Sequence, residues 1–146
     1  MTVKTIFLFC SVLVLSGCGK APETPAPAAG AVRAAGKRTL DSNGGTYKVT
    51  YETVPDPISS NEPFDLKFSV APQQAPAAAA ALTVEVDARM PAHFHGMNRA
   101  PKVSRQPDGS YKAEGLLFHM SGHWELYFDI AQTGKTERAQ VDINLK

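Results

Sequence analysis

The stretch "LTVEVDARM", residues 82–90, decides the fold, because apolar residues occupy every second position. Successive side chains of a β-strand point to opposite faces, so this period of two predicts a strand with one buried face and one solvated face. Burial of one face only is typical of antiparallel sheets. The residues on the predicted buried face are Leu82, Val84, Val86, Ala88 and Met90.

The same period recurs on both sides of this stretch, with turn-forming residues between the runs. The "QPDG" sequence at residues 106–109 suits a type I turn, so it should join residues 102–105 to residues 110–118 as a hairpin. The alanine-rich segment 71–81 is expected to form a loosely packed connection. Further strands are expected at residues 47–51, 64–70, 124–130 and 139–145.

About seven short strands with regular turns predict an all-β fold. We expect residues 41–146 to form one domain, an immunoglobulin-like antiparallel β-sandwich. Loops at one end of such a sandwich lie together even when they are far apart in the sequence.

The N-terminus has the layout of a secretory signal. Lys4 supplies a positive charge, and residues 5–16 form an apolar stretch that falls short of the about 20 residues needed to span a bilayer. The "LSGC" sequence at residues 15–18 resembles the lipobox of bacterial lipoproteins. The resemblance implies a signal peptide at residues 1–17 and a diacylglycerol group on the sulfur of Cys18. An uncleaved anchor and an ordinary signal peptide are the alternatives.

A lipid on Cys18 would hold the protein on a membrane of the cell envelope, facing the periplasm. The residue after Cys18 is Gly19 rather than an aspartate, which resembles the pattern of lipoproteins sent to the outer membrane. We therefore slightly favour the outer membrane over the inner one. Residues 18–40 are rich in proline, alanine and glycine and show no apolar period, so we expect a tether. A docked helix at residues 31–35 is the alternative.

Cysteine and charge exclude several classes of function. Cys10 would leave with the signal peptide and Cys18 would carry the lipid, so the mature chain has no thiol for a zinc finger or a redox motif. The chain has 15 basic and 14 acidic residues, and loss of Lys4 would make the two numbers equal. We therefore expect no nucleic-acid partner.

Soft metal-ligating side chains gather in two segments, "MPAHFHGMN" at residues 90–98 and "HMSGHW" at residues 119–124. These segments contain all four histidines and every methionine except Met1. Imidazole and thioether groups suit copper, and thioether favours the cuprous ion. If the two segments meet at one end of the sandwich, they would form a copper site. The candidate ligands are His93, His95, Met97, His119, Met120 and His123.

Structural roles compete with metal binding at several of these positions. Met90 ends a strand on the buried parity, so core packing is the better interpretation for it. Met120 shares a parity with Trp124, which we expect in the core with its indole N–H near a rim, so Met120 could pack there too. Histidines at a corner can also simply face water, and His95 is the strongest single candidate.

The sequences "MPAHFHGMNRAPKV" and "DGSYKAEGLLFHMSGHWELYFDI" resemble the YtkA-like domain, a relative of FixH-like proteins. The resemblance spans about residues 46–143 and implies an immunoglobulin-like β-sandwich outside the cytoplasm. It also implies a link to copper handling or to the assembly of haem-copper oxidases. His93, His119 and His123 are additional to the family pattern. The matching positions are Met90, Pro91, His95, Gly96, Pro101, Val103, Gly109, Tyr111, Phe118, Met120, Gly122 and Trp124.

We therefore expect a membrane-anchored extracytoplasmic lipoprotein that binds or delivers copper, with a copper or oxidase-assembly protein of the envelope as its partner. The alternative is an immunoglobulin-like interaction module that works without a metal. We do not expect an enzyme, because Ser121 and His123 lie in no nucleophile elbow and no HExxH helix is present.

Overall fold

The computed structural model describes residues 36–74 and 82–146, which form nine strands and one short 3₁₀ turn. The expected signal peptide, Cys18, most of the tether and residues 75–81 lie outside the described residues. Within the described ranges, no helix has the length and apolar character needed to span a bilayer. The strands are β1 (Arg38–Asp41), β2 (Tyr47–Val54), β3 (Pro63–Pro72), β4 (Thr83–Met90), β5 (His95–Gly96), β6 (Lys102–Arg105), β7 (Tyr111–Leu117), β8 (Gly122–Gln132) and β9 (Lys135–Leu145), and the 3₁₀ turn is η1 (Pro91–His93).

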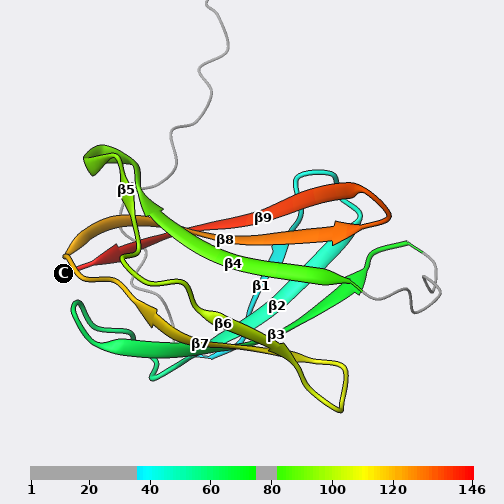
Figure 1. Ribbon diagram of the computed structural model, residues 1–146, viewed down its shortest axis with the longest axis horizontal. Coiled ribbons are helices and arrows are strands. Elements are labelled where there is room, and N and C mark those ends of the chain that lie inside the picture. Colours follow the sequence, from blue (N-terminus) through cyan, green and yellow to red (C-terminus); the bar gives the residue numbers. More distant parts are fainter. Residues whose placement is uncertain (1–35, 75–81) are drawn as a thin grey trace, which may run out of the picture.

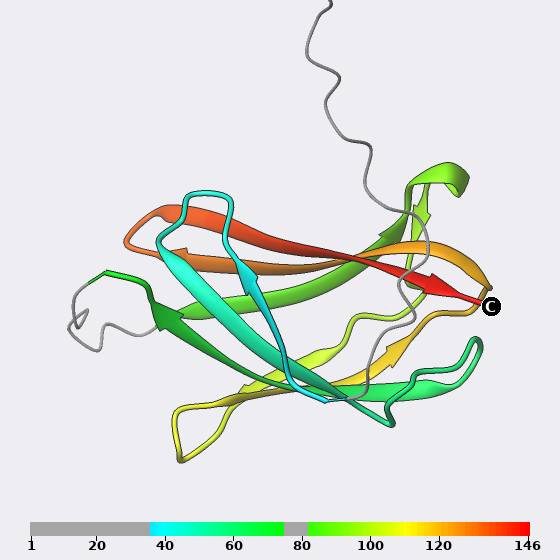
Figure 2. The ribbon, with the colours of Figure 1, turned by 180° about the vertical axis from the view of Figure 1, so that it is seen from behind.

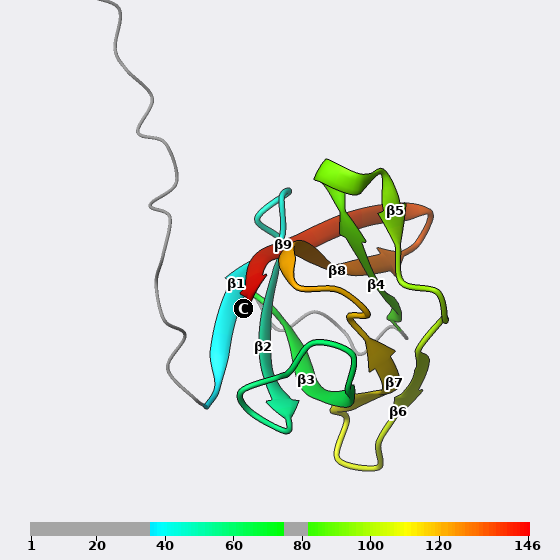
Figure 3. The same cartoon turned by 90° about the vertical axis from the view of Figure 1, so that its left-hand side faces the viewer.

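The strands form two antiparallel sheets that pack face to face (Figure 1). One sheet has the order β1-β2-β3-β7-β6 and the other has the order β5-β4-β8-β9. Figure 3, viewed from the end that carries β5 and the C-terminus, shows the two layers one above the other. The predicted antiparallel β-sandwich is therefore confirmed.

The core lies between the sheets and is built by the alternating apolar residues. Val84, Val86, Ala88 and Met90 are buried, as the period of two predicted for β4. At the centre, the ring of Phe68 stacks on Tyr111 at 5.3 Å and meets the ring of Phe128 edge-on at 5.1 Å. Burial of each such side chain stabilises the fold by about 1.5–3 kcal/mol, so this face-to-face packing holds the two sheets together.

The predicted turn at residues 106–109 is confirmed. The Gly109 N–H donates to the Gln106 carbonyl at 3.0 Å, and the Gln106 N–H donates to the Ser110 carbonyl at 2.8 Å. Gly109 has a φ of 83°, a conformation that costs glycine little. The turn joins β6 to β7 as a hairpin, and the register pairs Arg105 with Tyr111.

Two short strands were not predicted from the sequence. Strand β1 begins at Arg38, inside the segment expected to be a tether, and pairs along β2 (Figure 2). The Arg38 guanidinium donates to both carboxylate oxygens of Asp56 at 2.7 Å, which ties this edge strand to the loop after β2. The second addition is β5, which has two residues. Strands of two to four residues carry too few side chains to display a period.

Candidate metal centre

The segment that carries His93 and His95 is a tight hairpin at the end of β4. Pro91 opens η1 with a φ that suits a helical turn, and the Phe94 N–H donates back to the Pro91 carbonyl at 3.2 Å. The chain then returns as β5, which pairs His95 with Met90. As a result, both histidines are held at the same end of the molecule as the C-terminus (Figure 1).

Gly96 permits this return, because β5 runs against the backbone of β4. A Cβ atom at Gly96 would lie 3.0 Å from the Ala88 carbonyl oxygen, closer than most Cβ contacts. The Met97 N–H donates to the same carbonyl at 3.1 Å. The glycine therefore serves the approach of one strand to another and thereby sets the position of His95.

The second segment is the corner between β7 and β8, and it is organised by Trp124. The indole ring stacks on Phe118, with centroids 4.6 Å apart and planes 4° apart. The indole N–H donates to the Met120 carbonyl at 3.0 Å, as expected for a tryptophan near a rim. These two contacts close the corner between Phe118 and Trp124 and thereby fix the backbone that carries His119.

The two segments converge. The rings of His95 and His119 have centroids 5.0 Å apart, although 24 positions separate them in the sequence. The ring of His93 lies 5.8 Å from that of His95. Both His95 and His119 also meet the ring of Trp124, at 5.9 and 5.4 Å. We call His93, His95 and His119 the histidine row, with His95 at its centre.

The spacing of the histidine row fits a shared metal ion. Two imidazoles on one ion, with metal–nitrogen bonds of about 2 Å and a tetrahedral angle, have centroids roughly 5 Å apart. The 5.0 Å between His95 and His119 agrees with that value, whereas the 5.8 Å between His93 and His95 is longer. Among the described residues, the ring nitrogens of His93, His95 and His119 do not all lie within 4.8 Å of one another, so closing a three-ligand site requires side-chain rotations.

The hydrogen bonding of the row leaves ring nitrogens available as ligands. The Nδ1 of His119 is buried and has no hydrogen-bond partner among the described residues. The Nδ1 of His95 lies 3.2 Å from the Gly96 carbonyl, and donation to that oxygen would leave its Nε2 with a free lone pair. Metal-bound histidines commonly donate their second ring nitrogen to a carbonyl in this way.

The methionines take three different positions. Met90 is 1% exposed and belongs to the core, as the sequence favoured. Met120 is 38% exposed because the corner turns it outward, so it is not a core side chain. Met97 is half-buried, packs against the core and borders the same depression as His95. Met97 and Met120 are the thioethers on the chain segments that carry the row.

His123 stands apart from the row. It lies on β8, and its Nε2 is 3.4 Å from a carboxylate oxygen of Asp142 on β9. No ring contact joins it to the other three histidines in the part of the chain that the structure describes. His123, Glu125 and Asp142 instead offer one ligand atom each within 4.8 Å of one another. Sequence reasoning missed both carboxylates, because each looks like an ordinary outward residue of its strand.

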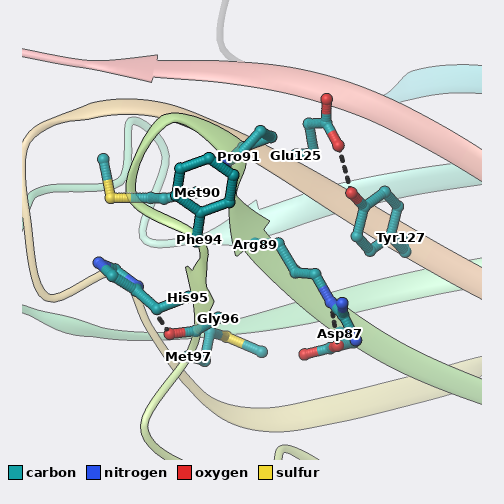
Figure 4. Close-up of a pocket in the computed structure, with 10 residues that line it drawn as sticks. All are labelled: Asp87, Arg89, Met90, Pro91, Phe94, His95, Gly96, Met97, Glu125 and Tyr127. Atoms are coloured by element: carbon teal, nitrogen blue, oxygen red, sulfur yellow. Dashed lines mark hydrogen bonds and ion pairs between the residues drawn. The ribbon is translucent and has the colours of Figure 1, made fainter.

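A depression of about 620 Å³ lies beside the row, on the outer face of the four-stranded sheet (Figure 4). His95 and Met97 border it from β5 and the residue after it, and Glu125 and Tyr127 border it from β8. Figure 4 shows the His95 ring directed away from the side chains of Glu125 and Tyr127. Phe94, which is 96% exposed, stands at its rim.

The charges of the depression are arranged in pairs. The Tyr127 hydroxyl donates to the Glu125 carboxylate, and the Arg89 guanidinium lies 3.6 Å from the Asp87 carboxylate. Burial, followed by the hydrogen bond to Glu125, raises the pKa of Tyr127 to about 12. The phenol therefore stays protonated at neutral pH and keeps the proton that it donates to Glu125.

The fold and these positions can be compared with known proteins. No curated protein and no solved structure matches the chain. A family model described as YtkA-like matches residues 41–129, which is more than half of the chain and includes both histidine-bearing segments. The chain therefore belongs to the YtkA-like family.

Proposed function

We propose that this protein is a membrane-tethered extracytoplasmic lipoprotein that binds cuprous copper and delivers it to a partner in the envelope. The observation that carries the proposal is the 5.0 Å approach of the His95 and His119 rings across 24 positions of sequence. An unpartnered buried Nδ1 on His119 supports it, because a buried polar nitrogen is costly unless something binds it.

The donor set favours copper over the common hard cations. The row offers imidazole nitrogens, and the same chain segments carry the thioethers of Met97 and Met120. Thioether ligands select the cuprous ion, whereas magnesium and calcium prefer oxygen ligands. These imidazole and thioether groups would bind the cuprous ion as a soft cation without a thiol ligand.

Delivery rather than permanent storage is supported by exposure. His93 is exposed and His95 is half-buried, so an ion held by the row would remain within reach of a partner's ligands. The Nδ1 of His119 is buried, so this nitrogen would hold the ion on the protein side. Such a gradient of exposure suits transfer of an ion from one protein to another.

The location in the proposal depends on the N-terminal sequence and on the family. The apolar stretch at residues 5–16 and the "LSGC" sequence at residues 15–18 support export and lipidation of Cys18. Residues 18–37 would then connect the lipid to β1. A copper or oxidase-assembly protein on the same membrane surface is the partner we propose.

A cuprous-ion titration tests the proposal. The full-length protein, purified in detergent, would compete for cuprous ion with a chromophoric chelator. We expect the His95→Ala/His119→Ala double variant to bind at least tenfold more weakly, and His123→Ala to bind like the unaltered protein. Equal affinity of the double variant and the unaltered protein would refute the assignment of the row.

One observation favours a second function, a metal-free interaction module. Phe94 is 96% exposed at the tip of the hairpin, where a large apolar side chain is available to a protein partner. Under this alternative, capture of the envelope partner by the metal-free protein would depend on Phe94 and would survive the His95→Ala/His119→Ala change.

A further inference from the structure

The solvent face of the four-stranded sheet carries a second group of ligating side chains. His123 and Glu125 are two residues apart on β8 and therefore share a face. The register places Asp142 of β9 directly opposite Glu125. One ligand atom from each of the three side chains lies within 4.8 Å of the others.

These distances suit closure around one ion. Ligand atoms that bind an ion at about 2.0–2.2 Å lie roughly 3–4 Å from one another. The His123 Nε2 and the Asp142 carboxylate are already 3.4 Å apart. Because adjacent strands hold the three backbones in register, only side-chain rotation is needed to bring Glu125 in.

The electrostatics of this face leave two carboxylates without a fixed cation. Like charges directly opposite on neighbouring strands destabilise a sheet. Arg89, which lies opposite Glu125 on β4, approaches Asp87 at 3.6 Å instead. Within the described residues, no lysine or arginine forms an ion pair with Glu125 or Asp142, and the His123 imidazole lies 3.4 Å from the Asp142 carboxylate.

The other nearby cation is also engaged. The Arg138 guanidinium donates to the Asp129 carboxylate at 2.7 Å and lies 4.2 Å over the Tyr127 ring. The Tyr127 hydroxyl in turn donates to Glu125 (Figure 4). A hydrogen bond of this kind orients a carboxylate for a metal, as partners behind the direct ligands do in known sites.

We propose that His123, Glu125 and Asp142 form a second cation site, which takes a divalent transition-metal ion such as Zn²⁺. One imidazole nitrogen and two carboxylate oxygens form a ligand set that suits Zn²⁺, and the site contains no sulfur to favour the cuprous ion. The two carboxylates balance the charge of the ion. The site differs in ligands and in position from the histidine row, so it stands or falls separately from the proposed function.

The site is an exchangeable one. The side chains of His123 and Asp142 are 42% and 51% exposed, so an ion there would keep water in its remaining positions. Three protein ligands with an open position are typical of zinc sites that do not serve only the fold.

Calorimetric titration with Zn²⁺ tests the proposal. The full-length protein in detergent would first carry His93→Ala, His95→Ala and His119→Ala, which remove the histidine row as a competing zinc site. We expect this triple variant to bind one Zn²⁺ per chain. Adding Asp142→Asn should weaken zinc binding by at least about tenfold. Loss of a residue that only hydrogen-bonds a metal ligand already costs roughly 10- to 100-fold, and Asp142 would be a direct ligand.

Glu85→Gln in the same background is the matched control. Glu85 lies on the same face, on neighbouring strand β4, and is exposed. We expect it to leave the zinc affinity unchanged. No zinc binding below millimolar concentration, or equal affinities for Asp142→Asn and Glu85→Gln, would overturn the proposal.

The folded state of Asp142→Asn is checked by thermal unfolding without metal. The substitution keeps the shape of the side chain and removes one of two like charges, so we expect an unchanged or higher midpoint. Added Zn²⁺ should raise the midpoint of the triple variant but not that of the variant that also carries Asp142→Asn. An equal zinc-induced rise in both would also overturn the proposal.

Discussion

Trp124 stacks flat on Phe118, with ring centroids 4.6 Å apart, and this pair forms the base on which the histidine row is assembled. The same indole ring lies 5.9 Å from the ring of His95 and 5.4 Å from the ring of His119, with the planes inclined at 64° and 78°. One buried side chain therefore joins the core of the sandwich to both halves of the candidate site. Changes to it should affect stability and metal binding together.

Trp124→Phe should destabilise the domain by about 1–3 kcal/mol, because it leaves a cavity and removes the hydrogen bond to the Met120 carbonyl. Cuprous affinity should fall as well, since His119 loses the ring that positions it. Urea unfolding and the chelator competition measure the two effects. An unchanged unfolding midpoint would contradict the role given to the indole.

Phe94→Asn should leave the free energy of unfolding within about 1 kcal/mol of the original value or raise it. Phe94 has a φ of 56°, a left-handed conformation that costs most residues about 1 kcal/mol and that asparagine tolerates. The 96% exposed ring contributes no packing that could be lost. Phe118→Ala is the contrasting change: it empties a fully buried position and should cost about 3–5 kcal/mol. Similar losses in the two variants would show that Phe94 packs in solution.

Gly96→Ala should destabilise the domain by about 1–3 kcal/mol, because the new Cβ would lie 3.0 Å from the Ala88 carbonyl and push β5 away from β4. The displaced β5 would carry His95 with it, so cuprous affinity should fall too. Chemical unfolding and the cuprous titration measure the change. A variant with full stability and full affinity would show that the hairpin adapts without cost.

Protonation of Asp56 should make the domain less stable in acid. Burial raises the pKa of its carboxyl, but hydrogen bonds from Arg38 and from the Gly36 N–H outweigh burial and hold the pKa below its usual value. Because the pKa is lower in the folded state than in the unfolded chain, the stabilisation is complete at pH values above about 4. It is lost as the pH falls through the lowered pKa.

Asp56→Asn should therefore flatten the acid side of a plot of unfolding free energy against pH. At neutral pH it should cost about 1.5–3 kcal/mol, the contribution of a hydrogen bond to a charged group. Asp41→Asn, in an exposed pair with Lys48, is the control and should cost at most about 1 kcal/mol. Parallel pH profiles for Asp56→Asn and the unaltered protein would contradict the prediction.

Much of the fold could be predicted because its signals are local. The alternation at residues 82–90 corresponds to β4, and the sequence at residues 106–109 forms the hairpin turn between β6 and β7. A strand with one buried face must place apolar residues at every second position, and a tight turn needs residues that accept its backbone angles. Strands β1 and β5 could not be predicted, because each is too short to show a period and forms only by pairing with the strand beside it, β2 or β4.

The candidate site was only partly predictable. The sequence by itself determined which donors are present and that no cysteine follows Cys18. The tertiary structure alone decided that His119 lies beside His95 while His123, four residues later, faces Asp142. The physical reason is that the corner at Met120 and the register between β8 and β9 are settled by packing and pairing between distant segments. No periodicity within one segment can encode such contacts.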